Sequence, residues 1–131
     1  MQRDARLRTG IWIDALIRRA QVGGAFALVS RSGDRDAGSV LVAVRSRDAL
    51  FVYMAERDMD GRRVWRSRRV DEAGLQQEIA QRTDFDPDLN VIEIDDAQGR
   101  HFIEETVMGS EEAQEDAAAA SAEARALFQD R

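Results

Sequence analysis

Residues 39–55 of the chain read SVLVAVRSRDALFVYMA, and this stretch decides the fold. Its first half places valine at positions 40, 42 and 44, the period of two that is typical of a strand. Arg47-Asp48 suits a tight turn, and the apolar run Leu50–Ala55 follows it. The stretch therefore predicts two sequential antiparallel strands.

Two further strands are expected on either side of this pair. Ala25–Ser30 is short and apolar and follows two glycines, which predicts a buried strand. Asp60-Gly61 is a strong hairpin signal, and Arg62–Arg69 after it predicts a fourth strand with arginine on both faces. Charge on both faces favours an edge position, because it blocks unwanted pairing. We expect a four-stranded antiparallel meander.

Helices are predicted before and after the meander. Apolar residues, among them Trp12, recur at helical spacing over residues 10–22, with Thr9 as a plausible N-cap. Asp71 is a good N-cap for a second helix over residues 71–83. We expect the first helix to cover one face of the sheet, with Trp12 as a core anchor.

The last part of the chain predicts one or two more strands and a tail. Asn90–Asp95 places Ile92 and Ile94 on one face of a strand, and Arg100–Glu104 is expected to pair back on it. From Ser110 on, the sequence is rich in alanine and glutamate. The expectation is one α+β domain over residues 1–109, followed by an acidic tail over residues 110–131 that is helical or frayed.

Composition narrows the classes of function. The 131 residues include no cysteine, which excludes disulfides, thiol catalysis and thiolate zinc sites. The net charge is −6, which argues against a general nucleic-acid binder. The apolar runs are far shorter than a membrane span, and the start of the chain lacks the apolar core of a signal peptide. We expect a cytoplasmic protein that does not interact with membranes.

The aspartates at positions 84, 86 and 88 imitate the first ligands of a calcium loop. The pattern then fails, because Leu89 takes the place of the required glycine and Asp95 that of the bidentate glutamate. The better interpretation is that Asp86-Pro87-Asp88 forms a turn whose side chains cap backbone amides. No metal or cofactor is predicted.

His101, the only histidine, is a candidate general base. With Asp86, Asp88 and Arg100 it forms the set of candidate catalytic residues for a small hydrolase or a metal-dependent enzyme. No nucleophile-elbow spacing surrounds the serines at positions 30, 32 and 39. A lone histidine is more often a surface or hydrogen-bonded structural residue, so whether the protein is an enzyme stays open, with the balance against it.

The arginine-rich strand predicted over residues 62–69 is a second candidate site. Arginines that alternate with aromatic residues suit single-stranded nucleic acid, through phosphate contacts and base stacking. The alternative is a solvated edge strand whose arginines pair with the nearby acids Glu56, Asp58 and Asp60. The candidate ligand-binding residues on and beside this strand are Arg63, Trp65, Arg66 and Arg68, with Tyr53 on the neighbouring strand.

The polar loop Gly33–Gly38 offers Asp34 and Asp36 as further candidate ligands. A hairpin loop that needs positive φ at its glycines explains the same residues equally well.

Several of these stretches together resemble a known family. Gly33–Gly38 with the following Val40-Leu41-Val42, and the run from Phe85 to Phe102, carry most of the likeness, supported by Leu7–Trp12 and Ala15–Arg19. Over residues 7–103 the chain resembles the small alphaproteobacterial proteins called domain of unknown function 1491. The resemblance implies a bacterial cytoplasmic protein of this size and no assigned activity. It draws attention to Asp34, Asp36, Asp86, Asp88, Arg100 and His101.

The sequence is compatible with three hypotheses about function. The first is a small non-enzymatic binding or adaptor module for a protein partner, which uses the arginine strand or the acidic tail. The second is a nucleic-acid-associated protein, and the third is the small enzyme built on His101. If the six residues converge in one pocket, an enzyme is favoured; if they scatter, the module is favoured. No oligomeric state is predicted.

Overall fold

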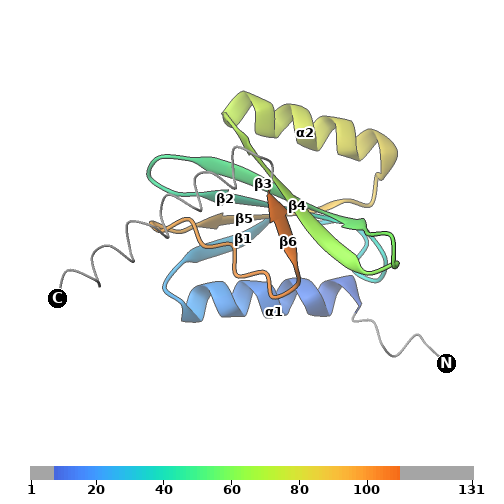
Figure 1. Cartoon of the computed structure of the whole chain (residues 1–131), viewed down its shortest axis with the longest axis horizontal. Coiled ribbons are helices and arrows are strands. Elements are labelled where there is room, and N and C mark those ends of the chain that lie inside the picture. The colour runs from blue at the N-terminus through green and yellow to red at the C-terminus, as the bar shows by residue number, and fades with distance from the viewer. Residues whose placement is uncertain (1–7, 110–131) are drawn as a thin grey trace.

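The computed structural model describes residues 8–109 and arranges two helices and six strands within them. A twisted sheet lies between the two helices, α1 and α2 (Figure 1). This arrangement confirms the α+β class. In chain order the elements are α1 (Thr9–Val22), β1 (Phe26–Arg31), β2 (Val40–Arg45), β3 (Leu50–Arg57), β4 (Arg63–Val70), α2 (Glu72–Phe85), β5 (Asn90–Asp95) and β6 (Val107–Gly109).

The sheet is mixed, with the strand order β1-β5-β2-β3-β4-β6. The hairpins β2–β3 and β3–β4 are antiparallel, as residues 39–55 and Asp60-Gly61 predict. The four-stranded meander is wrong at its start, because β5 lies between β1 and β2 and runs parallel to β2. Val91 and Ile92 are buried on opposite faces of β5, in the two cores under α2 and α1, as expected for a strand in the interior of a sheet that is covered on both faces.

β1 is an edge strand, and its prediction as a buried strand is wrong. Phe26 is 63% exposed and Leu28 is 41% exposed, whereas Ala27 between them is buried against α1. The apolar run indicated burial on both faces. Within residues 8–109, only the face of β1 that points toward α1 is covered.

β4 is not an edge strand among the described residues, which corrects the edge position predicted for the arginine-rich strand. The short strand β6 pairs with it in parallel, with Trp65 opposite Val107. The segment Arg100–Glu104 forms no strand, so the expected pairing with β5 is also wrong. Arg63, Arg66 and Arg68 of β4 pair with glutamates from outside the strand, as described below.

α1 covers one face of the sheet and confirms the predicted helical face. Ile13 and Leu16 are fully buried, together with Val42 and Ile94 from the sheet. The valines of β2 point toward α1, and the alternate residues of β2 point toward α2. Thr9 is not the N-cap, because Arg8 precedes the helix and the Thr9 hydroxyl donates to the carbonyl of Gly38.

α2 covers part of the opposite face. The side chain of Asp71 accepts a hydrogen bond from the amide of Gly74, which confirms the predicted N-cap. Leu75 is fully buried and joins a second core. The sheet residues of this core come from β2, β3 and β5, with none from β1: Leu41, Ala43, Leu50, Val52 and Val91. The β1 side of this face therefore lacks a helix within residues 8–109.

Neither helix of the described region combines the length and the apolar character needed to cross a membrane. The predicted helical tail over residues 110–131 lies outside the described residues.

Candidate functional site

The loop over residues 33–38 and the turn over residues 86–90, the two family-like stretches, meet at Asn90. This side chain is fully buried. Its Oδ1 accepts a hydrogen bond from the amide of Gly33 at 2.7 Å, and its Nδ2 donates to the carbonyls of Asp34 and Ser39 at 3.1 and 3.3 Å. Asn90 therefore holds the loop against the turn.

Gly33 and Gly38 are required in the loop because of a close backbone contact, and the positive φ that the sequence analysis expected at them is wrong. A Cβ on Gly33 would lie 1.9 Å from the carbonyl oxygen of Asp88, and one on Gly38 would lie 2.2 Å from the same atom. Neither glycine has a positive φ. The two backbones approach so closely that a side chain has no room.

The aspartates of these stretches mainly cap backbone amides. Asp86 Oδ2 accepts from the amide of Ser39 at 2.9 Å and from its hydroxyl, and Oδ1 accepts from the amide of Asp88. The bonds from Ser39 hold the pKa of Asp86 below its usual value. Asp34 caps the amide of Asp36 in the same way. The predicted capping turn is confirmed for Asp86.

Arg100 and His101 lie at the other end of α1 from these aspartates. Arg100 donates to the carbonyl of Gly23, next to the C-terminus of α1, and pairs with Asp96 at 2.7 Å. Arg35, within the loop, donates instead to the carbonyl of Gly10 near the N-terminus of α1. A helix of this length spans about 20 Å. The six residues do not converge in one pocket, which is the arrangement that favours a binding module.

His101 is tied into the fold by its own hydrogen bond. Its Nδ1 accepts from the amide of Ile103 at 2.9 Å, and its ring lies 5.1 Å from that of Tyr53. Burial lowers the pKa of His101 and raises the pKa of Tyr53 to about 12. These contacts give His101 the hydrogen-bonded structural role that the sequence offered as the alternative to catalysis.

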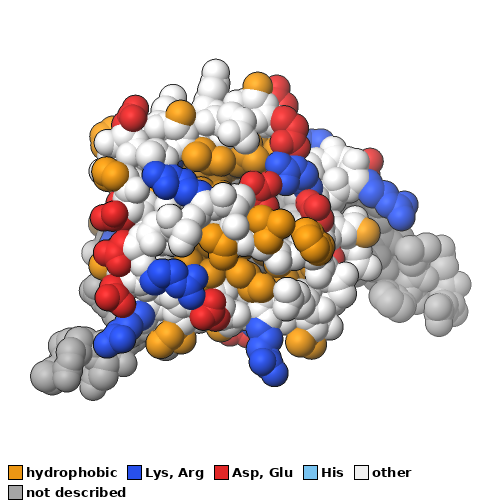
Figure 2. Space-filling view, turned by 180° about the vertical axis from the view of Figure 1, so that it is seen from behind, with side chains coloured by type: hydrophobic (Ala, Val, Ile, Leu, Met, Phe, Trp, Pro, Cys, Tyr) orange, Lys and Arg blue, Asp and Glu red, His pale blue; other side chains and the backbone are white. Residues whose placement is uncertain are grey.

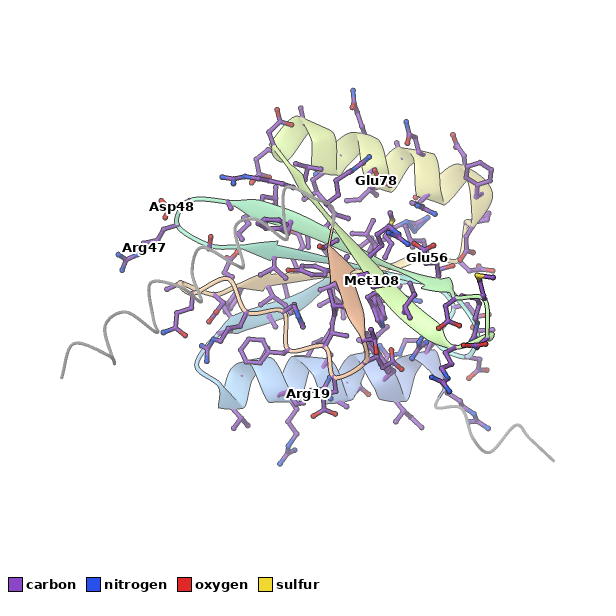
Figure 3. The ribbon with its side chains drawn as sticks, in the orientation of Figure 1. Arg19, Arg47, Asp48, Glu56, Glu78 and Met108 are labelled. Carbon is purple, nitrogen blue, oxygen red and sulfur yellow. The ribbon has the colours of Figure 1, made fainter. Side chains whose placement is uncertain are left out.

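A cleft with a volume of about 450 Å³ lies at the end of the sheet near the N-terminus of α1 and the C-terminus of α2. Glu56, which lines the cleft, lies at the opposite end of the molecule from Arg47 and Asp48 (Figure 3). The candidate residues that line this cleft are Asp36, Arg63, Trp65 and Asp86. The lining residues that the sequence did not single out for binding include Trp12, Met54, Arg57, Arg82 and Phe85.

One wall of the cleft is a stacked pair of tryptophans that contacts the charged side chains of Arg63 and Glu105. The rings of Trp12 and Trp65 are 4.9 Å apart, and the Arg63 guanidinium lies over both at 5.5 and 5.8 Å. Glu105 accepts from Arg63 at 2.8 Å and from the Trp65 indole at 2.6 Å. Burial raises the pKa of Glu105, but the bonds from Arg63 and Trp65 lower it by more, so the carboxylate stays ionised.

The other wall comes from α2 and the end of β3. Phe85, the last residue of α2, is 88% exposed at the rim, and Met54 is half-buried beside it in the lining. Arg82 pairs with Glu78, and Glu56 pairs with an arginine of β4. This wall therefore combines apolar surface with charges that already have partners.

The arginines predicted for nucleic acid all have partners inside the protein. Arg63 pairs with Glu105, Arg66 with Glu56, and Arg68 with Glu78. The local alternative is confirmed for Glu56, which lies ten residues before Arg66. Glu78 on α2, ten residues after Arg68, and Glu105, 42 residues after Arg63, were not among the acids that the sequence analysis named.

The two aromatic residues of the nucleic-acid hypothesis are buried. Trp65 is fully buried and Tyr53 is 7% exposed, so neither ring offers a face on which a base can stack. Binding of nucleic acid stays a prediction, but the base stacking on Trp65 and Tyr53 that supported it is not possible in this fold.

The acids of the described residues are not grouped for a metal. Within residues 8–109, no set of three or more histidine, aspartate or glutamate side chains is placed to hold an ion.

Comparisons with known proteins identify one family and several solved structures that are similar to this chain. A family model for proteins of unknown function (DUF1491) matches residues 7–104. A crystal structure of a DUF1491 family protein from Caulobacter crescentus CB15 is similar at 43% identity, with a TM-score of 0.73 over 78% of this chain and 99% of that one. An NMR structure of a DUF1491 family protein from the same organism has a TM-score of 0.71 at 43% identity, over 77% of this chain and 96% of that one.

A solution structure of a protein from A. tumefaciens is also similar, with 26% identity and a TM-score of 0.64 over 79% of this chain and 97% of that one. No match is found among curated proteins. The family model spans α1 through the segment that precedes β6, and so includes both loops joined by Asn90. The chain belongs to the DUF1491 family of proteins of unknown function.

Proposed function

We propose that this protein is a small cytoplasmic, non-enzymatic binding module that holds an apolar side chain of a partner protein in the cleft at the end of the sheet. The observation that carries the proposal is the exposure of Phe85 in the lining of a cleft whose opposite wall includes Trp12 and Trp65. Aromatic residues are enriched in protein interfaces, and binding sites are concave and mostly apolar.

The charges of the cleft support binding rather than proton transfer. Asp86 is held by Ser39, Arg63 by Glu105, and Glu56 by Arg66. A carboxylate or guanidinium that already has its partner provides a fixed polar rim around the apolar surface. Such a site orients a ligand without changing its own protonation.

Selection from a random peptide library tests the proposal. Peptides selected on the full chain are expected to share an apolar anchor residue. They should quench or shift tryptophan emission, because both tryptophans of the chain line the cleft. Phe85→Ser should weaken their binding by about tenfold or more, as expected for loss of an interface anchor.

Ile11→Ser is the matched control for the loss of an exposed apolar side chain. Ile11 is 53% exposed on α1 and does not line the cleft. Its replacement should leave peptide affinity unchanged. If selection enriches no peptide, or if the two variants weaken binding equally, the cleft is not the binding site.

A further inference from the structure

We propose that the part of the sheet that no helix of residues 8–109 covers, on the α2 side of β1 and β5, docks a basic amphipathic helix from a partner protein. This surface is separate from the cleft, and the inference does not rest on the function proposed for it.

Two apolar side chains of β1 mark this surface. Phe26 pairs with Asp95 and Leu28 pairs with Glu93 across the β1–β5 ladder, so all four side chains share one face. This is the α2 face, because the intervening Ala27 packs toward α1. Phe26 and Leu28 are 63% and 41% exposed. They form an adjacent apolar pair that α2 does not reach.

The width of this surface suits one helix. Neighbouring strands lie about 4.8 Å apart and a helix with its side chains is about 10 Å wide, so a helix covers roughly two strands. α2 packs on the core formed with β2 and β3, which leaves β1 and the adjoining side of β5. Seen from behind, hydrophobic side chains gather between α2 and α1 and are flanked by charged ones (Figure 2).

The charge beside the apolar pair identifies the kind of partner. Arg45 contacts three carboxylates, at 2.7 Å for Glu72, 2.6 Å for Glu93 and 3.9 Å for Asp95. One guanidinium therefore faces three carboxylates, and the group carries a net charge of −2. The side chains of Glu72 and Asp95 remain 66% and 59% exposed. A helix with arginine or lysine beside its apolar stripe complements this surface.

The charge of residues 110–131 argues against this segment of the same chain as the helix that docks on this surface. Residues 110–131 contain six acids and two arginines, a net charge of −4. This sign opposes docking on an acidic surface. It instead strengthens the attraction of the whole chain for a basic partner.

The experiment titrates the full chain with three synthetic 18-residue peptides. The first carries a leucine stripe and arginines at helical spacing. The second replaces each arginine with glutamate, and the third scrambles the first while keeping its composition. Only the first should bind, and its affinity should fall as salt rises, because screening weakens the charge contribution. Isothermal titration calorimetry gives the dissociation constants, and backbone amide NMR shifts locate the contact.

Two variants and one control test whether the first peptide binds to the surface formed by β1 and β5. Phe26→Ser removes half of the apolar pair, and Asp95→Asn removes one exposed charge. Each should weaken the first peptide by about threefold or more, whereas Ile11→Ser on α1 should not change its affinity. Melting temperatures should stay unchanged in all three variants, because each side chain is exposed.

Three results would each overturn the proposal. These are binding of the glutamate peptide with equal affinity, amide shifts confined to α1 or to the cleft, and no binding of the first peptide at millimolar concentration. Failure of the cleft peptides leaves this test intact, because the two surfaces share no side chain.

Discussion

Individual polar side chains fix the conformation of the segment after β5 and its contacts with α1. Phe102 has a φ of 61°, which non-glycine residues rarely adopt. Its carbonyl accepts from Arg19 at 3.0 Å, and the Arg100 guanidinium lies 4.9 Å from its ring. His101, next to it, accepts the amide of Ile103. The residues that first suggested catalysis thus stabilise an unusual backbone conformation.

The lowered pKa of His101 predicts a pH dependence of stability. In the unfolded chain this group titrates near 6.5, and in the folded chain it titrates lower because it is buried. Between these values the unfolded state binds more protons, so stability is full above about pH 6.5 and falls as pH drops below it. One group contributes a slope of at most about 1.4 kcal/mol per pH unit.

Urea denaturation at pH 7.5 and pH 5.5 measures this effect. His101→Gln keeps a hydrogen-bond acceptor and cannot titrate, so its stability should change less across the interval than that of the wild type. The carboxylates with lowered pKa, such as Asp86 and Asp96, titrate below this window. Identical pH dependence in the two proteins would show that His101 titrates normally in the folded chain.

At the scale of elements, the loop over residues 33–38 and the turn over residues 86–90 act as one unit. Asn90 provides the hydrogen bonds, and the loop also reaches α1, since the amide of Gly10 donates to the carbonyl of Arg35. The start of α1, the start of β2 and the start of β5 are therefore held at one end of the sheet. This end is where the cleft lies.

Asn90→Ala should destabilise the protein by about 2 kcal/mol, because it leaves the amide of Gly33 without its acceptor and removes the bonds that Nδ2 donates to the carbonyls of Asp34 and Ser39. Urea unfolding followed by circular dichroism gives the change. Asp88→Asn in the same turn is the control. That side chain is exposed, so its replacement should alter stability by less than about 0.5 kcal/mol. Equal effects of the two variants would rule out Asn90 as the link between loop and turn.

For the whole molecule, two cores lie on opposite faces of one sheet. The core under α1 includes Trp12 and Trp65, and the core under α2 includes Leu75 and Val52. Both clusters are built from residues of the described region, 8–109. We therefore predict that residues 1–109 form one domain that folds without the rest of the chain.

A chain that ends at Gly109 should therefore melt within a few degrees of the full chain. The large apolar residues beyond this point are Leu127 and Phe128, both near the end of the sequence. Alanine buries little area, so the hydrophobic gain from ordering the tail is small against the entropy lost. Differential scanning calorimetry of the two chains makes the comparison. A large fall in melting temperature would mean that residues 110–131 contribute to the core.

The sequence by itself determined the elements whose signals are local. The alternation of valines in β2, the spacing of apolar residues in α1 and the cap at Asp71 each depend on residues within a few positions of one another. These patterns follow the side-chain periods of a strand and a helix, so they can be recognised without knowing how the rest of the chain packs. The capping turn at Asp86 belongs to the same class.

Only the tertiary structure decided which strands are neighbours and which charges pair. β5 lies next to β1 and β2 although some sixty and fifty residues separate them along the chain. The partners of Arg63 and Arg68 come from the segment that precedes β6 and from α2, and Phe85 lines the same cleft as the two tryptophans. Such pairings depend on how the whole chain buries its apolar faces, and a period of two or 3.6 carries no information about them.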